Sequence, residues 1–447
     1  MARINWKDSL ELERDIAILM VEQEEYGVYF DEGKARYYIT LLERMKEEQY
    51  IIIRPYLTYD IIIKETKDKE GGYNYVKKIF LKNGNFTTTI LNWFDDPSMV
   101  MGQFTRISFD EPSMSKRGLI IKQLLKLGWK PKVFTDKGFP KLTDEGEPVE
   151  TLEEVGPFGK ALSLWYIYNH RQSSITGFLS HIRPDGRIAA QIDSCGTNTF
   201  RAKHRVVANI PRPTSVFGKE MRSLFGVREG RCFVGADVAG LELRMLAHHM
   251  NDPDYTELVL HGDIHTYNQN LAGLPTRDDA KTFIYAWLYG AGSTKIGSIV
   301  GGGSKQGKIL IDSFMTGLPS VARLITKVKG FAERKGYLPS IDGRKIYVRS
   351  YDGRVLVHTA LNCLLQANGS IVTKRALSIA SAEINRRGLD AHIIIFYHDE
   401  FAFDTSPECS IEVGELLVDS MRLAGEYYNL NIPITGAYAI GNNWGVH

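Results

Sequence analysis

Two acidic residues follow apolar runs that are typical of buried strands. Asp237 comes directly after Cys232–Ala236, and Asp399 comes two residues after Ile393–Tyr397. Each carboxylate is therefore expected at the rim of a buried sheet, and the sequence leaves open whether the two meet. Such a pair, completed by backbone oxygens and substrate phosphates, suits two Mg²⁺ ions, which prefer a few carboxylates together with phosphate and water. Isolated acids are more often helix caps or surface groups.

A second set of residues recurs at four-residue steps: Arg277, Lys281, Tyr285 and Tyr289. Four residues turn an α-helix by about 400°, so the side chains drift only about 40° per step and stay on one face. Two cations followed by two rings suit a triphosphate followed by a sugar and a base. Amphipathic helices also place Arg and Lys four residues apart by chance, so the spacing alone does not establish this function.

The elements that must position these residues change in character along the chain. Residues 8–50 predict two helices, and residues 55–105 predict strands with an Asn83-Gly84 hairpin signal. Helical periodicity returns before residue 185. Beyond it the pattern is α+β: a strand ends on Asp237, helices follow, and a strand pair carries Asp399 at its turn.

Composition narrows the class of protein. With 447 residues, 43% of them hydrophobic, two or three subdomains are expected. The cysteines Cys195, Cys232, Cys363 and Cys409 form no CxxC pair and no His/Cys cluster, which indicates neither a disulfide framework nor a zinc site and fits a reducing compartment. The N-terminus is charged, and no stretch reaches the roughly 18 apolar residues of a membrane helix. We therefore expect a cytoplasmic protein with no membrane association.

Charge is unevenly distributed although the net charge is only +2. Between residues 201 and 231 two acids stand against eight basic residues: Arg201, Lys203, Arg205, Arg212, Lys219, Arg222, Arg228 and Arg231. Such a run is a candidate stripe for tracking the phosphates of a nucleic acid. An ordinary solvated surface explains about half of such runs.

Three segments resemble motifs of a known family. GADVAGLELR (235–244), RDDAKTFIYAWLYG (277–290) and YHDE (397–400) resemble motifs A, B and C of family A, or DNA polymerase I-like, DNA polymerases. The sequences of these segments are similar to those in the replicative polymerases of podoviruses that use host thioredoxin. FTDKGFP, HGDIHTYNQ, IDGRK, ALNCLLQ and the terminal NNWGVH also match in order.

The resemblance implies roles for individual residues. The catalytic residues would be Asp237, Asp399, Glu400 as an accessory acid, and Lys281, with Asp237, Asp399 and the backbone of Val238 binding two Mg²⁺ ions that Mn²⁺ could replace. Six residues would bind the dNTP: Glu242, His265, Arg277, Lys281, Tyr285 and Tyr289. Glu242 would exclude ribose, held in place by the hydroxyl of Tyr285. Six residues would contact DNA: Arg201, Gly290, Arg344, Asn362, Gln366 and His398. Phe200 stands where the family usually has glycine before the arginine, which makes the position of Arg201 less secure.

The same resemblance implies an α+β right-hand polymerase with an antiparallel palm sheet. We expect a thumb-like helical region at 1–190 with a β-rich insertion at 55–105, a palm at 191–260 and 340–447, and fingers at 261–339. The chain would be a DNA-directed DNA polymerase that extends a primer in phage replication inside a bacterial host. The carboxylates left over form no second cluster, so no proofreading is expected in this chain, and a separate exonuclease subunit is a possible partner. A thioredoxin-like or other processivity factor could bind the insertion.

Two other classes remain as alternatives. A single-subunit RNA polymerase shares the palm aspartates and the Arg/Lys/Tyr helix, but a bulky acid at Glu242 should exclude ribose. A catalytically silent DNA-binding accessory would not need every catalytic side chain, and all of them are present.

Overall fold

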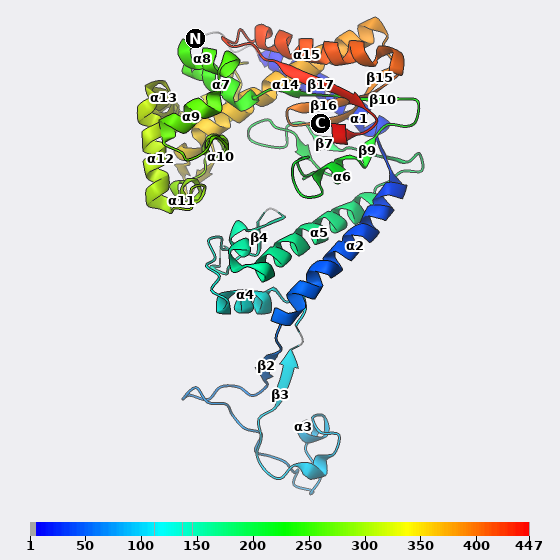
Figure 1. Ribbon diagram of the computed structural model, residues 1–447, viewed down its shortest axis with the longest axis vertical. Helices are drawn as coiled ribbons and strands as arrows, with labels where there is room; N and C mark the ends of the chain where they lie inside the picture. The colour runs from blue at the N-terminus through cyan, green and yellow to red at the C-terminus, as the bar shows by residue number, and fades with distance from the viewer. Residues whose placement is uncertain (1–5, 111, 136, 145, 447) are drawn as a thin grey trace. The chain divides into compact units, whose positions relative to one another are not determined.

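The computed structural model describes residues 6–110, 112–135, 137–144 and 146–446 (Figure 1). The chain divides into two compact units. The first takes the chain up to Arg36 and again from Ile175 onward, and the second comprises Tyr37–Ser174. Every residue expected to do chemistry lies in the first unit.

A four-stranded antiparallel sheet forms the centre of the first unit, with strand order β15-β16-β10-β17. Its strands are β10 (Cys232–Val238), β15 (Ala391–Tyr397), β16 (Glu400–Thr405) and β17 (Gly436–Gly441). The two central strands, β10 and β16, consist almost entirely of buried residues because helices cover the sheet. This hydrophobic burial stabilises the strands whose ends carry Asp237 and Asp399.

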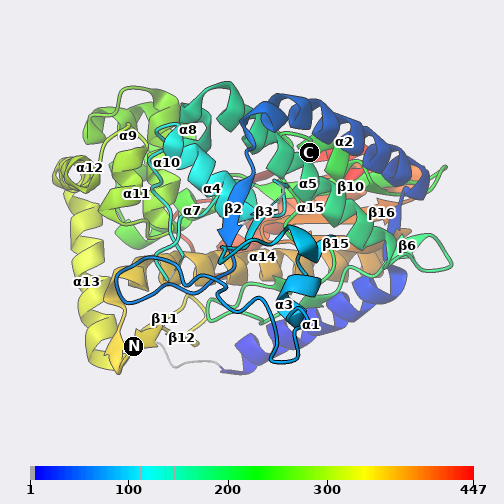
Figure 2. The same ribbon diagram turned by 90° about the horizontal axis from the view of Figure 1, so that it is seen from below.

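Helices surround this sheet. Helix α15 (Ser410–Tyr427) contacts β10 and β17, α14 (Ala360–Arg387) packs on α15, and α1 (Trp6–Tyr26) contacts β15. A group of further helices gathers beside the sheet (Figures 1 and 2). These are α7 (Leu241–Met250), α8 (Pro253–His261), α9 (Ile264–Ala272), α10 (Arg277–Leu288), α11 (Ser293–Ser298), α12 (Ser304–Gly317) and α13 (Pro319–Lys335).

Short elements complete the first unit. They are β1 (Val28–Phe30), β6 (Arg187–Ile188), β7 (Ile192–Asp193), β8 (Lys203–His204), α6 (Gly218–Arg222), β9 (Phe225–Gly226), β11 (Tyr337–Pro339), β12 (Lys345–Tyr347), β13 (Ser350–Tyr351), β14 (Arg354–Val355) and the 3-10 turn η6 (Trp444–Val446). The expected extended segment around IDGRK is the β11–β12 hairpin.

The second unit is built on helices with its own hydrophobic core. Its helices are most of α2 (Glu32–Ile53), α3 (Thr88–Leu91), α4 (Arg117–Lys126) and most of α5 (Pro157–Leu179). Its strands are β2 (Asp60–Ile63), β3 (Ile107–Asp110), β4 (Thr143–Asp144) and β5 (Glu147–Pro148). The core contains Ile53, Ile120, Leu124, Trp129 and Phe158.

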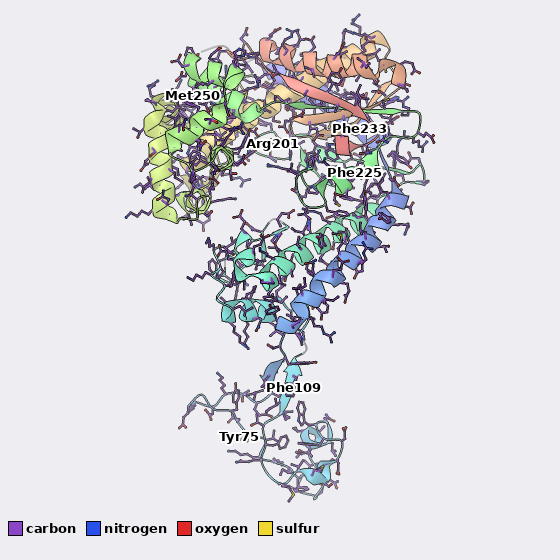
Figure 3. All side chains as sticks on the ribbon, in the orientation of Figure 1. Tyr75, Phe109, Arg201, Phe225, Phe233 and Met250 are labelled. Atoms are coloured by element: carbon purple, nitrogen blue, oxygen red, sulfur yellow. The ribbon has the colours of Figure 1, made fainter. Side chains whose placement is uncertain are left out.

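The insertion at 55–105 is less β-rich than its sequence indicates. One ribbon, β2 paired with β3, leads into it, and the expected hairpin around Gly84 is reduced to an isolated bridge between Phe80 and Phe86. Strands of this kind need a buried face, and few insertion side chains are buried. Large apolar side chains are exposed in the insertion and on the adjoining ribbon, among them Tyr75 of the insertion and Phe109 of β3 (Figure 3).

The boundary of the thumb-like region also differs from the expected 1–190. Helix α1 belongs to the unit of the sheet, because its Glu13 binds Lys374 of α14 at 2.7 Å and its Gln23 donates to the carbonyl of Ala190 at 2.7 Å. The helical unit is residues 37–174. Residues 1–5, 111, 136, 145 and 447 of the expected ranges lie outside the described residues.

No single helix within the described ranges has the length and apolarity needed to cross a membrane, and only the bent pair α12 and α13 passes the same test together, by length and composition alone.

Candidate active site

The two acids occupy neighbouring positions at one edge of the sheet. Asp237 lies near the end of β10 and pairs with Glu400, the first residue of β16. Asp399 stands immediately before β16, and its carbonyl accepts a hydrogen bond from the amide of Val238 at 3.1 Å. The β10–β16 pairing thus brings together two acids that are far apart in the sequence.

Asp399 lies in a two-residue turn between β15 and β16. Tyr397 pairs with Glu400, which leaves only His398 and Asp399 between the strands. His398 has a φ of +64°, a left-handed conformation that costs free energy in a residue other than glycine. Burial, followed by the charge of Glu242, raises the pKa of Asp399 to about 6. A nearby cation would relieve this penalty because it favours the charged carboxylate.

Helices α9 and α10 bring the expected triphosphate-binding residues together. The rings of His265 and Tyr285 lie 6.2 Å apart between their centroids. Burial, followed by the charges of Arg277 and Lys281, lowers the pKa of His265, so these groups lie within electrostatic reach of one another. The predicted helix face is therefore present, and Lys281 is exposed on it.

A carboxylate that the sequence reasoning did not single out organises this face. Asp263 caps α9, and it accepts hydrogen bonds from the amides of His265 and Thr266 at 3.2 Å. Its other oxygen lies 2.8 Å from Nε of Arg277. One side chain therefore orients both a histidine and an arginine toward the same region.

Glu242 lies in the first turn of α7 and is held by a tyrosine. The hydroxyl of Tyr289, at the end of α10, donates a hydrogen bond to Oε1 of Glu242 at 2.6 Å. The expectation that Tyr285 holds this acid is therefore wrong. Burial, followed by the charges of Glu242 and Asp399, raises the pKa of Tyr285, so its ring lies near both acids. Tyr289 takes the hydrogen bond because it lies one turn farther along the same face.

A small pocket joins residues of the first and third motif segments with Arg201 and Gln366, two further residues expected to contact DNA. Its wall includes Arg201, Glu242, Gln366, His398 and Asp399. Nδ1 of His398 is buried and has no hydrogen-bond partner among the described residues. The pocket thus offers a cation, an amide and an imidazole directly beside an acid expected to bind metal.

Arg201 is placed by a strained neighbour. Phe200 has a φ of +58°, the left-handed region that favours glycine, and its carbonyl accepts a hydrogen bond from Ser370 at 2.9 Å. The backbone therefore adopts the conformation natural to glycine although the side chain is large. Figure 3 shows Arg201 between Met250 of α7 and Phe233 of β10.

Arg344 does not have the role expected of it. Its side chain is only 6% exposed, and it forms ion pairs with Glu13 and with Asp342, the latter at 2.7 Å. Its guanidinium also lies 4.9 Å from the ring centroid of Phe200. We therefore correct the prediction that Arg344 binds DNA: this side chain supports the segment before Arg201, because its hydrogen-bonding capacity is used inside the protein.

Glu400 also faces the interior. Its carboxylate lies 3.2 Å from Nη1 of Arg222 and accepts a hydrogen bond from Nε1 of Trp444. The residue is 8% exposed, although its charge contributes to the raised pKa of Asp399. The structure therefore corrects its expected role as an accessory acid at the metals.

The remaining expected DNA contacts lie at the end of α10 and the start of α14. Nδ2 of Asn362 donates to the carbonyl of Leu288 at 2.9 Å, which ties the two helices together. Gly290 is exposed and has a φ of +82°, which a residue with a side chain would adopt only with strain.

Only part of the basic run at 201–231 is free to meet a polyanion. Arg231 binds Asp390 and Asp404, and Arg222 binds Glu400. Five members are exposed and form no ion pair with any residue that the structure describes: Lys203, Arg205, Arg212, Lys219 and Arg228.

The acids fit ions that take most of their ligands from a substrate. Across the described ranges no cluster of three or more His, Cys, Asp or Glu side chains forms a closed metal site. Asp237 is exposed, and Asp399 carries a raised pKa that a cation would offset. Two carboxylates at an open edge suit Mg²⁺, which keeps waters and binds phosphate, and Mn²⁺ accepts similar ligands.

Asp263 and Trp444 received no site role from sequence reasoning, which placed Arg222 in the phosphate-tracking stripe. A signal existed for Asp263, because an Asp just before a helical run is a typical N-cap. No local signal indicated that Trp444 and Arg222 bind Glu400, because only the fold brings this partner to them.

The sheet and its flanking helices have the arrangement of a known polymerase domain. The structure resembles the POL domain of Pol1 from M. smegmatis, solved in complex with a DNA primer-template and dNTP, with a TM-score of 0.73 and 19% identity over 97% of this chain and 70% of that one. This likeness confirms the α+β right-hand polymerase fold.

Sequence comparison finds relatives of this chain among phage polymerases. The chain is 35% identical to the DNA-directed DNA polymerase of Escherichia phage Phieco32, over 66% of this chain and 62% of that protein. It is 33% identical to the corresponding enzyme of Escherichia phage T7, over 74% of this chain and 52% of that protein. The match thus spans between about half and three-fifths of these relatives. The model of DNA polymerase family A matches residues 119–446, and the chain belongs to this family.

The lowered pKa values of two histidines at the site predict that the folded protein loses stability in acid. Burial, followed by the charge of Arg201, lowers the pKa of His398 to about 3 and that of His204 to about 4. Below about pH 6.5 these histidines are protonated in the unfolded chain but remain neutral in the folded chain. The free energy of unfolding should therefore fall by at most about 1.4 kcal/mol per pH unit for each histidine. Above pH 6.5 this contribution is complete.

Urea unfolding of the wild type and of His398→Asn between pH 7.5 and 5 measures this effect. Asparagine tolerates the positive φ, so the variant should fold and lose less stability in acid than the wild type. The exposed His181→Asn is the control and should follow the wild type. Parallel pH curves for all three proteins would contradict the prediction.

Proposed function

We propose that this chain is a DNA-directed DNA polymerase that extends a primer by nucleotidyl transfer from dNTPs in phage replication. The observation that carries the proposal is the position of Asp237 and Asp399 at one edge of the sheet, where Asp237 pairs with Glu400 and the amide of Val238 donates to the carbonyl of Asp399. Helix α10 presents Arg277, Lys281 and Tyr285 beside them. Carboxylates for metals and cations for phosphates are what phosphoryl transfer requires, because the reaction depends on positioning and charge.

The dNTP side of the site follows from these positions. Asp237 and Asp399, with the backbone oxygen of Val238, would hold two Mg²⁺ ions. When bound, the ions would activate the primer 3′-hydroxyl and neutralise the charge that develops on the phosphates. Arg277 and Lys281 would hold the triphosphate and stabilise the leaving pyrophosphate.

The sugar and base would be held by the other residues of α7, α9 and α10. His265 would contact the phosphates from α9, and the ring of Tyr285 would pack on the sugar and base. Glu242, fixed by Tyr289, would occupy the position next to the 2′ carbon.

The DNA side uses the pocket and its neighbours. Arg201 and Gln366 would bind acceptors on the minor-groove side of the newest base pairs, where correct pairs look alike. Asn362 would lie beside them at the start of α14, where its Nδ2 donates to the carbonyl of Leu288. Tyr289 and Gly290 would limit the space for the templating base.

The parts of the fold take names accordingly. We assign the sheet, α7, α14 and α15 to the palm, residues 261–339 to the fingers, and the helical unit 37–174 to the thumb. The exposed basic residues near the sheet then track the phosphates of the primer-template.

Primer extension tests this function directly. The purified chain is given a primer-template with dNTPs or rNTPs, each with Mg²⁺, Mn²⁺ or chelator. We expect extension with dNTPs that requires the metal and is much weaker with rNTPs. Equal use of rNTPs would favour an RNA polymerase, and DNA binding without extension would favour an accessory protein.

We further propose that the insertion increases processivity, by binding a thioredoxin-like or other factor or by holding the duplex itself. Its exposed apolar side chains include Tyr75, Phe80 and Met101. Aromatic residues are enriched at binding interfaces, and large exposed apolar patches mark interaction sites. Phe94 and Phe104 pack together, so part of the insertion has its own small core.

Removal of the insertion should shorten the products made per binding event. The ion pair of Glu65 and Arg106 (2.7 Å) closes its base, so residues 66–105 can be replaced by a Gly-Ser linker without disturbing the β2–β3 ribbon. With a trap for free DNA, we expect product length to fall several-fold at unchanged single-nucleotide incorporation.

Two arms separate the sources of this effect. If the loss occurs with the purified chain alone, the insertion holds DNA, and if it occurs only with added thioredoxin, the insertion binds that factor. Unchanged product length in both arms would remove the insertion from the mechanism.

A further inference from the structure

The turn that carries Asp399 is held from one side by a residue near the C-terminus. Trp444 is fully buried, and its ring centroid lies 5.4 Å from that of Tyr397. Its Nε1 donates a hydrogen bond to Oε1 of Glu400. Tyr397 and Glu400 are the two residues that flank the turn, so one side chain contacts both of its ends.

Arg222 completes this contact from a third segment. Its Nη1 lies 3.2 Å from Oε2 of Glu400, its Nε donates to the carbonyl of Pro211 at 3.2 Å, and its guanidinium lies 4.5 Å from the ring centroid of Trp444. The carboxylate of Glu400 is thus bound by two donors that are themselves in contact. A buried carboxylate bonded to both is fixed in one orientation, because leaving either donor unpaired is costly.

The turn needs such support because its backbone is strained. His398 adopts a φ of +64°, and strained backbone persists only where the surroundings enforce it. Asp399 is the next residue, so relaxation of His398 would redirect the carboxylate that faces the metals. The carbonyl of Asp399 in the same turn also accepts a hydrogen bond from the amide of Val238 on β10.

We propose that Trp444 and Arg222 are positioning residues that fix the turn of Asp399 for metal binding. They act through their bonds to the carboxylate of Glu400. The proposal rests on the proposed function and deepens it. It assigns to Glu400 an indirect role, because its carboxylate faces Arg222 and Trp444. It also makes the segment after β17 part of the active-site structure.

Trp444→Phe tests the proposal with little change in packing. Phenylalanine keeps a ring against Tyr397 but removes the N–H donor to Glu400. Trp129→Phe is the matched control, because Trp129 is also buried and its Nε1 donates to Oγ1 of Thr151 at 3.0 Å in the other unit. Both variants lose one buried indole hydrogen bond and should lose similar stability.

Mn²⁺ binding followed by electron paramagnetic resonance is the first readout, and Asp399→Asn identifies the signal of this site. We expect Trp444→Phe to weaken Mn²⁺ binding about five- to tenfold and to raise the Mg²⁺ concentration needed for half-maximal extension by a similar factor. The kcat should fall about tenfold with the KM for dNTP within twofold. Trp129→Phe should match the wild type in all three.

Arg222→Lys provides an independent arm if Trp444→Phe does not fold. It keeps the charge but loses the fork geometry, and we expect a smaller shift of Mn²⁺ binding in the same direction. The proposal is overturned if Trp444→Phe, or Arg222→Lys in its place, binds Mn²⁺ like Trp129→Phe. Failure of the wild type to extend primers would instead refute the proposed function, because the Mn²⁺ readout requires no turnover.

Discussion

Replacement of Asp237 or Asp399 by alanine should abolish primer extension while the chain still folds and binds DNA. Each substitution removes a proposed metal ligand at the edge of the sheet and opens no cavity in the core. The loss should reach at least about 4 kcal/mol of transition-state stabilisation, roughly a thousandfold in rate. Single-turnover extension of a labelled primer at saturating dNTP measures it.

Asp399→Ala should not lower the thermal stability of the protein, although it is expected to abolish extension. The pKa of Asp399 is raised to about 6, so above that pH the folded chain carries a carboxylate that burial and Glu242 disfavour. Melting at pH 8 should therefore show a Tm equal to or above that of the wild type, a common relation between active sites and stability. The exposed Asp254→Ala is the control for both measurements. Extension above a tenth of the wild-type rate in either variant would refute the two-metal assignment.

Glu242→Ala should admit ribonucleotides. A ribose 2′-hydroxyl would collide with the carboxylate or strip it of solvent, so discrimination here comes from repulsion. We expect the ratio of kcat/KM for dNTP over rNTP to fall about a hundredfold, which corresponds to ~2.7 kcal/mol. Some dNTP efficiency should be lost as well. Steady-state incorporation of matched dNTP and rNTP pairs provides the ratio.

Two tyrosine variants decide how the acid is held. Tyr289→Phe removes the hydroxyl that lies 2.6 Å from Glu242 and should relax discrimination by a few-fold to tenfold, since the acid remains but is less fixed. Tyr285→Phe keeps that bond and should retain the wild-type ratio. If Tyr285→Phe relaxes discrimination more than Tyr289→Phe, the bond between Tyr289 and Glu242 does not govern the sugar site.

Much of the candidate site could be predicted because its signals are local. Asp237 follows a run of strand residues, and Arg277, Lys281 and Tyr285 recur at the spacing of one helix face. Local periodicity determines which residues share a face and which stand at a strand end, whatever the rest of the chain does. The motif order then implied the right-hand fold, which the structural likeness confirms.

The incorrect predictions concern partners that only long-range pairing selects. Arg344 was expected to bind DNA, but its guanidinium forms an ion pair inside the fold with Glu13, which is 331 residues away in the sequence. The tyrosine on Glu242 is Tyr289, because the approach of α10 to α7 decides which ring reaches the acid. A pattern of residue types does not distinguish a free arginine from one that an ion pair holds.

The amino-acid sequence by itself thus predicted the strand-end acids, the basic helix face and the order of the elements, since these depend on residue type and short-range spacing. The tertiary structure decided which carboxylate faces the open edge of the sheet and which faces the interior. Asp399 and Glu400 are adjacent and both acidic, but successive residues at a strand end point in different directions, and only the packing of Trp444 and Arg222 against Glu400 sets those directions. It likewise placed α1 with the sheet and bounded the helical unit at 37–174, because burial joins segments that the chain order separates.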